Sequence, residues 1–180
     1  EFFLNAPLYE RLTRDMSPCP EDIRSYVRTI HGFMNAGYDY ATILVPGLWF
    51  PAGEVHHEST RSLNEGSVIK DKASFDEYAW PEPANADYGI LDRLSSELPP
   101  GMKLIVYGPN GVLENVIRLV GYENLCYMTI DDLPLASDIF EAVGSRLVEY
   151  YKHCVAHDAV GAVIGNDDWG FKSQTMLPPE

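Results

Sequence analysis

The chain has 180 residues, of which 46% are apolar and 12% aromatic, as is typical of a globular protein with a hydrophobic core. Asp and Glu number 27 against 13 Lys and Arg, so the net charge is −14, and without a concentrated basic face we expect no nucleic-acid partner. No apolar run approaches the ~20 residues that span a bilayer, and no basic and then apolar leader opens the chain, so we expect a cytoplasmic protein without membrane attachment.

The first predicted elements are a helix, a buried strand and a long loop. Apolar residues recur at three- and four-residue spacing over 22–35 and stop before Gly37, which predicts an amphipathic helix. Residues 40–45 form a nearly continuous apolar run, which is typical of a parallel strand buried on both faces. The segment 48–83 is rich in Gly, Ser, Pro and Asp and has no sustained period. Such a long irregular insert favours a functional loop.

The rest of the chain alternates helices and strands in the same way. Apolar spacing and short apolar runs predict, in order, helix 87–98, strand 103–107, helix 112–120, helix 122–130, helix 134–157 and strand 159–164. The end of the third of these helices, Cys126 to Ile130, would also fit a strand. Asp132 is available to cap the long helix that follows. This alternation is typical of a parallel sheet covered by helices, in a barrel or a doubly wound sheet.

Length bears on the choice of fold. A complete (β/α)8 TIM barrel takes about 250 residues. With three predicted strands, this α/β chain is expected to hold roughly the N-terminal half of such a barrel, as a single partial domain over residues 1–180. A half-barrel leaves sheet edges and apolar helix faces open, so we also expect aggregation or a homodimer unless the rest of the barrel is present.

Ligands of parallel α/β folds bind at the carboxyl ends of the strands, so the residues after each strand are the candidates for function. The segment 165–170 follows the last strand and has two adjacent acids, Asp167 and Asp168, that we predict to be catalytic. The residues predicted to bind substrate also lie at the ends of strands or after them, and they are Trp49, Tyr107, Asn110, Asn166 and Trp169.

Each of these clusters also has a purely structural interpretation. Asp167 or Asp168 could cap the following helix, with Trp169 packed on a neighbouring loop. Residues 108–111 could present backbone N–H groups to an anionic ligand at a helix N-terminus, or form a tight turn with no ligand. Trp49 could pack within its loop. The residue types alone do not separate these alternatives.

Metal ligation has weaker support. His153 and His157 lie four residues apart on the long helix beside Cys154, a spacing that can hold zinc. This end of the helix leads into a strand, however, and therefore lies at the face of a barrel opposite the active site. The segment from His56 to Glu58 has no third ligand that can be placed. We therefore predict no metal site within this chain and expect the cysteines to be reduced thiols.

From Gly101 onward the chain resembles the uroporphyrinogen decarboxylase superfamily. The strand followed by Gly108-Pro-Asn-Gly is similar to the family's strand and Gly-x-Pro turn, and the helix from Tyr122 followed by Asp131-Asp132-x-Pro134 resembles its pair of helices with an acidic-Pro junction. Asp158 to Trp169 resembles the family's Gly-Ala-Asp-Ala strand and Asp-Ser-Trp tip, and Leu177-Pro-Pro-Glu180 its Ser-Pro-Glu helix start. An earlier strand fits at Gly37 to Ala41.

This resemblance implies an enzyme, and departures from the pattern favour one branch. Porphyrinogen decarboxylases of the family have an Arg-rich N-terminal segment and a Phe-Ser-Asp tip; here the tip is Val45-Pro-Gly-Leu, without an acid, and Asn115 stands near the position of the family's active-site tyrosine. The methyltransferase branch, which transfers methyl groups to or from cobalamin, fits better.

For that branch the resemblance implies a corrinoid as substrate or partner, with a small molecule or a corrinoid protein as the second substrate. Zinc activation of a thiol is possible, but its ligands would lie outside this chain. One alternative is a cofactor-free decarboxylase of uroporphyrinogen or a related tetrapyrrole acid, in which Asp167 or Asp168 would stabilise the protonated pyrrole. A second alternative is a tetrapyrrole-binding module without catalytic activity.

Overall fold

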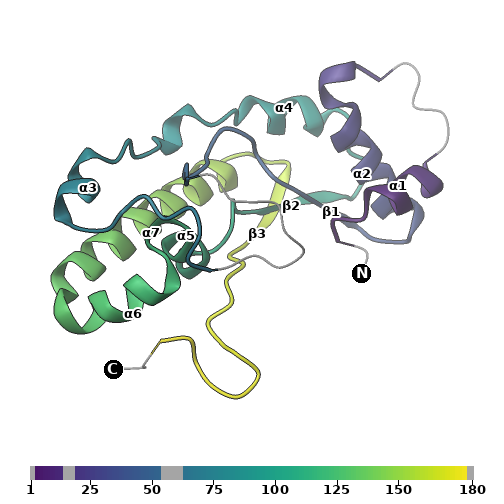
Figure 1. Ribbon diagram of the computed structural model, residues 1–180. Helices are drawn as coiled ribbons and strands as arrows, with labels where there is room; N and C mark the ends of the chain where they lie inside the picture. Colours follow the sequence, from purple (N-terminus) through teal and green to yellow (C-terminus); the bar gives the residue numbers. More distant parts are fainter. Residues whose placement is uncertain (1–2, 14–18, 54–62, 178–180) are drawn as a thin grey trace. The chain divides into compact units, whose positions relative to one another are not determined.

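The computed structural model describes residues 3–13, 19–53 and 63–177. The chain divides into two compact units, each assembled from three separate stretches. We call the first the sheet unit, and it comprises Glu1–Gly47, Ala84–Gly108 and Tyr150–Ile164. The second, the helical unit, comprises Leu48–Pro83, Pro109–Glu149 and Gly165–Glu180. Figure 1 gives the element labels used below.

The sheet unit contains a three-stranded parallel sheet in the order β1 (Tyr40–Ile43), β2 (Lys103–Tyr107) and β3 (Val160–Ile164) (Figure 1). The fold is therefore mixed α/β with an open parallel sheet, and the described residues contain no closed barrel. The register between β2 and β3 is interrupted between Leu104 and Ile105. Gly161 lies at this irregularity, where an added Cβ would come within 2.9 Å of the Lys103 side chain.

Short helices accompany this sheet. They are α1 (Ala6–Leu12), η1 (Glu21–Ile23), α2 (Arg24–Asn35) and α4 (Gly89–Ser95). The buried face of α2 carries Val27, Ile30 and Phe33, and the Phe33 ring lies within 6 Å of the rings of Tyr9, Tyr38 and Tyr40. This aromatic cluster joins α1, α2 and β1, because offset aromatic rings add specific contacts to the area that they bury.

The last turns of α7 (Leu133–Val155) belong to the sheet unit and anchor the end of β1. Tyr150 is fully buried. Its hydroxyl donates a hydrogen bond to the Val45 carbonyl (3.1 Å) and accepts one from the Val45 N–H (3.0 Å). Val45 thus pairs with a side chain instead of with β2, which explains why the strand ends at Ile43 and not at the predicted Val45.

The helical unit is built around α5 (Val112–Val120), α6 (Tyr122–Asp131) and the first part of α7, with α3 (Lys72–Glu77) in the long insert. The short η2 (Pro83–Asn85) begins at the last residue of this insert. The insert is tied to α5, because the N–H groups of Val68 and Ile69 both donate to the Leu119 carbonyl (2.8 Å each). Arg146 ties it to α7 by donating to the Pro81 carbonyl (3.0 Å) and stacking on Trp80.

The structure confirms the helix–strand alternation and the helical assignment of Tyr122–Asp131, and the Asp132 side chain caps α7 through the Leu135 N–H (3.2 Å). It adds α1, which was not predicted, and shows that the insert, predicted to be a loop, contains α3. The long helix ends at Val155, two residues earlier than expected. In the described residues, none of the helices is both long and apolar enough to cross a bilayer.

Candidate functional site

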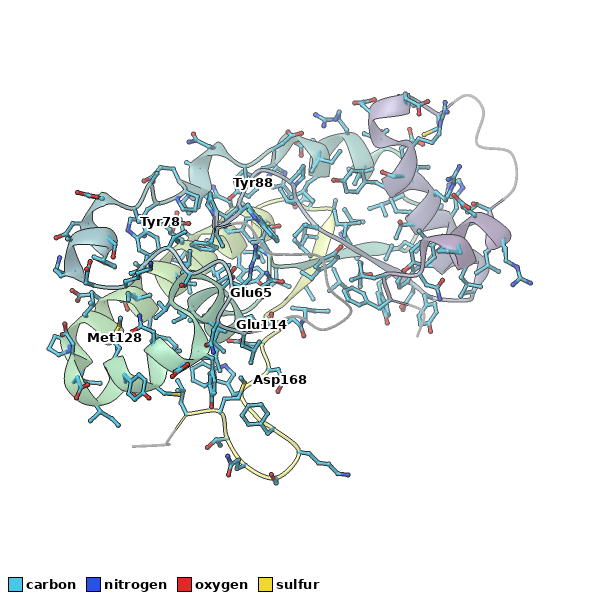
Figure 2. The ribbon with its side chains drawn as sticks, in the orientation of Figure 1. Glu65, Tyr78, Tyr88, Glu114, Met128 and Asp168 are labelled. Carbon is cyan, nitrogen blue, oxygen red and sulfur yellow. The ribbon has the colours of Figure 1, made fainter. Side chains whose placement is uncertain are left out.

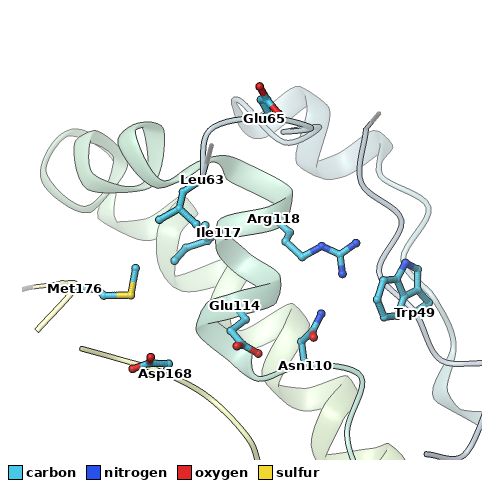
Figure 3. A pocket seen from close by; sticks show the side chains of 9 residues that line it. All are labelled: Trp49, Leu63, Glu65, Asn110, Glu114, Ile117, Arg118, Asp168 and Met176. Carbon is cyan, nitrogen blue, oxygen red and sulfur yellow. The ribbon is translucent and has the colours of Figure 1, made fainter. Parts of the chain in front are cut away.

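The helical unit holds a cavity of about 440 Å³, which is within the ~300–1,000 Å³ range of small-molecule sites. Figure 3 shows its lining side chains, which come from the long insert, the turn before α5, one face of α5 and the C-terminal segment; they are Trp49, Leu63, Glu65, Asn110, Glu114, Ile117, Arg118, Asp168 and Met176. Three of the predicted site residues, Trp49, Asn110 and Asp168, are thus brought together.

A buried asparagine holds the turn that presents Asn110. Asn115 is 1% exposed, and its side-chain amide donates to the carbonyls of Pro109 (2.9 Å) and Gly111 (2.8 Å). Asn110 has a φ of +64°, in the left-handed region that asparagine tolerates better than most residues. Asn115 therefore fixes the shape of the turn that borders the cavity.

Asp167 joins the C-terminal segment to the start of α5. Its carboxylate accepts hydrogen bonds from the backbone N–H groups of Leu113 (2.8 Å) and Glu114 (3.2 Å), and from the Trp169 indole (2.8 Å). The N-cap position of α5 is Gly111, which has no side chain to do this. Capping, one of the two interpretations of the sequence, is therefore present, but the helix capped is α5, which lies much earlier in the chain, and not a helix that follows Asp167.

The two acids consequently have different environments. Asp168 is exposed, lines the cavity and accepts one local hydrogen bond, from the Gly170 N–H (3.1 Å). Asp167 has its oxygens occupied by α5 and by Trp169, so its geometry supports a positioning role. Figure 2 labels Asp168 together with Glu65 and Glu114, the other two acids of the cavity, on three different segments of the helical unit.

The remaining predicted binding residues do not line this cavity. Trp169 packs near Phe140 of α7, with ring centroids 6.0 Å apart. Asn166 is exposed, and its backbone carbonyl lies beside Gly111. Tyr107 belongs to the sheet unit, where it packs edge-on against Phe3 and lines a separate cavity of about 260 Å³; burial raises the pKa of its hydroxyl. Their roles as ligand contacts stay predictions.

The electrostatics of the cavity are dominated by acids. The Arg118 guanidinium lies over the Trp49 ring, 4.4 Å from its centroid, within the range of a cation–π contact. Glu65, Glu114 and Asp168 supply three carboxylates to the same lining, and Arg118 is the one cationic side chain among the described lining residues. Glu114 also accepts a hydrogen bond from the Gly111 N–H (3.0 Å), which completes the start of α5.

The described residues contain no group of three or more His, Cys, Asp or Glu side chains arranged to hold a metal ion. His157 pairs with Asp92 (2.8 Å), whereas the His153 ring stacks on Tyr88. Cys154 is fully buried, and desolvation raises the pKa of its thiol to about 12, which disfavours the thiolate that zinc requires. These residues do not fit zinc; the segment from His56 to Glu58 lies outside the described residues.

Six residues of the cavity were not predicted from the sequence. Glu114, Ile117 and Arg118 lie at i, i+3 and i+4 on α5, and this spacing could have shown that they share one face. No local pattern marks Leu63 or Met176. The Leu63 carbonyl accepts a hydrogen bond from the Tyr122 backbone N–H, and the Met176 carbonyl accepts one from the Tyr122 hydroxyl. Glu65, also in the insert, was missed for the same reason.

We expect Asp167→Ala to lower the free energy of unfolding by about 1–2 kcal/mol, because the substitution leaves two backbone N–H groups at the start of α5 without their acceptor. Urea unfolding followed by circular dichroism measures this change. Asp168→Ala is the matched control, and we expect it to change stability by less than about 0.5 kcal/mol. Equal midpoints for the two variants would contradict the capping role.

Comparison of the chain with protein-family models, with curated proteins and with solved structures finds no match.

Proposed function

We propose that the chain is part of a (β/α)8 barrel of the uroporphyrinogen decarboxylase superfamily and acts as a methyltransferase-like enzyme on a corrinoid. One observation carries the proposal. Trp49 follows β1 in the chain, Asn110 follows β2 and Asp168 follows β3, and all three line one cavity. Enzymes with this fold place their catalytic residues after successive strands in the same way.

The charge of the cavity favours methyl transfer over the decarboxylase alternative. A tetrapyrrole acid carries several carboxylates and needs cationic side chains to bind them. This lining has three carboxylates and one guanidinium, so it would repel such a substrate. A methyl group in transfer between two nucleophiles is electron-poor, and carboxylates nearby stabilise it.

The residues have distinct roles in this proposal. Asp168 is the carboxylate that faces the reacting group, and Trp49 and Asn110 contact the body of the substrate. Asp167 is a positioning residue, since its bonds to α5 hold the segment that carries Asp168 against the turn that carries Asn110. The corrinoid is a substrate, and no step is assigned to zinc.

We expect Asp168→Ala to lower kcat/KM for methyl transfer at least ~10-fold, which corresponds to a loss of about 1.4 kcal/mol of transition-state stabilisation. The assay supplies methylcobalamin and a thiol, and follows the visible spectrum as the Co–C bond breaks. The electron pair stays on cobalt, a C–S bond forms and the thiol proton goes to solvent.

Asp131→Ala, at the exposed end of α6, is the control and should leave the rate unchanged. Unchanged kinetics for Asp168→Ala would rule out its role. Release of CO2 from uroporphyrinogen without methyl transfer would favour the decarboxylase, and tight tetrapyrrole binding without either reaction would favour a binding module.

A further inference from the structure

We propose that the cavity of the helical unit binds a ligand with a cationic, methylated ammonium group. The inference rests on the proposed function, because there a methylated ammonium would serve as the methyl donor. The binding of such a ligand is tested separately. It follows from three properties of the lining: an aromatic ring with a cation over it, an excess of carboxylates, and apolar walls.

The first property is the ring of Trp49. Figure 3 shows the Arg118 side chain extended toward this ring, and its guanidinium carbon lies 4.4 Å from the ring centroid. Trp is the side chain that attracts cations most strongly through its π-face, and quaternary ammonium groups use this attraction because they have no N–H to donate. Trp49 is 48% exposed, so part of the ring remains open to a ligand.

The second property is charge. The lining contains the carboxylates of Glu65, Glu114 and Asp168 and one guanidinium, that of Arg118, so its formal charge is −2. None of these three acids forms an ion pair within residues 3–13, 19–53 and 63–177. A ligand with a single positive charge reduces this excess, whereas an anionic ligand increases the repulsion.

The third property is the apolar wall. Leu63, Ile117 and Met176 form the side of the cavity that lies away from Trp49 in Figure 3. The methyl groups of a methylated ammonium have an apolar surface, so they can pack on aliphatic and thioether side chains. The positive charge of the ammonium is still attracted by the carboxylates at longer range. A primary ammonium would lose its hydrogen bonds to water on such a wall.

Calorimetric titration of the protein with choline and with its uncharged isostere 3,3-dimethyl-1-butanol tests the inference. The two probes have the same shape and hydroxyl group, and differ in one positive charge. We expect choline to bind at least ~10-fold more tightly, and we expect Trp49→Leu and Asp168→Asn each to weaken choline binding at least ~5-fold.

Trp80→Leu is the matched control, because Trp80 forms a second Arg-over-Trp pair among the described residues, with the Arg146 guanidinium carbon 4.9 Å from the ring centroid, and it does not line the cavity. Its choline affinity should equal that of the wild type. Equal affinity for choline and its isostere, or loss of binding in Trp80→Leu as large as in Trp49→Leu, would overturn the inference.

The two proposals fail separately. If methylcobalamin is demethylated but choline does not bind in preference to its isostere, the ligand class is wrong and the proposed function stands. If choline binds with the expected selectivity but no methyl transfer is measured with any donor, the ligand class stands and the proposed function is wrong.

Discussion

Replacing Gly111 by alanine should lower the free energy of unfolding by about 3 kcal/mol and abolish ligand binding in the cavity. An ideal Cβ at this position would overlap the side chain of Asp167 and the backbone carbonyl of Asn166. The backbone of Gly111 has a φ of −85°, which alanine adopts readily, so the expected effect comes from the collision and not from conformational strain.

The collision would separate two segments that form the cavity. To make room for the methyl group, residues 166 and 167 must move away from α5, and the hydrogen bonds from Leu113 and Glu114 to Asp167 are then lost. Asn110 precedes Gly111 and Asp168 follows Asp167, so the same movement displaces two residues of the lining. Binding should therefore fail even under conditions in which the variant remains folded.

Gly144→Ala is the matched control. Gly144 lies within α7, and a Cβ added there would meet nothing within 4 Å. Alanine is favoured over glycine inside a helix, so this variant should be more stable by about 0.5–1 kcal/mol. Urea unfolding measures both variants, and a destabilisation of Gly111→Ala no larger than about 0.5 kcal/mol would show that the contact with Asp167 is not tight.

Alkaline conditions should destabilise the protein steeply between pH 9 and pH 12. Burial raises the pKa of the Cys154 thiol from 9.0 to about 12, and burial also raises the pKa of the Tyr150 hydroxyl beside it. Above pH 9 the unfolded chain loses the thiol proton while the folded chain keeps it, so the folded state binds more protons and the free energy of unfolding falls as the pH rises.

The contribution of Cys154 is fully present below pH 9 and lost by pH 12, which amounts to up to about 4 kcal/mol for a pKa difference of about three units. Urea midpoints measured in reductant from pH 7 to pH 12 give the slope. In Cys154→Ala the slope should be smaller by up to one proton. A wild-type slope retained in Cys154→Ala would contradict this account.

The elements that the sequence predicts well are those with a strong local pattern. The strands β2 and β3 are short apolar runs between turns, and α5 and α7 have apolar residues at helical spacing along their buried sides. The helix α1 was missed because it has seven residues and buries only Tyr9, too few for a period to appear. Its one visible signal is Asn5, which caps the helix, followed by Pro7 in its first turn.

The candidate site was predictable to the extent that it follows strands. The rule that ligands bind after parallel strands led to Trp49, Asn110 and Asp168, which line the cavity. The same rule also selected Tyr107 and Trp169, which pack elsewhere, because it gives the segment and not the direction of each side chain. The capping of α5 by Asp167 spans 54 residues of sequence, and no local pattern encodes a contact of that range.

The two units are interleaved along the chain, and this bears on how the protein is made. Each unit needs three separate stretches, and the last stretch of the sheet unit, Tyr150–Ile164, comes after most of the helical unit. Neither unit can therefore be completed on the ribosome before the other is largely synthesised, and no single proteolytic cut releases either of them whole. Since many contacts join distant residues, we expect slow folding that begins late in synthesis.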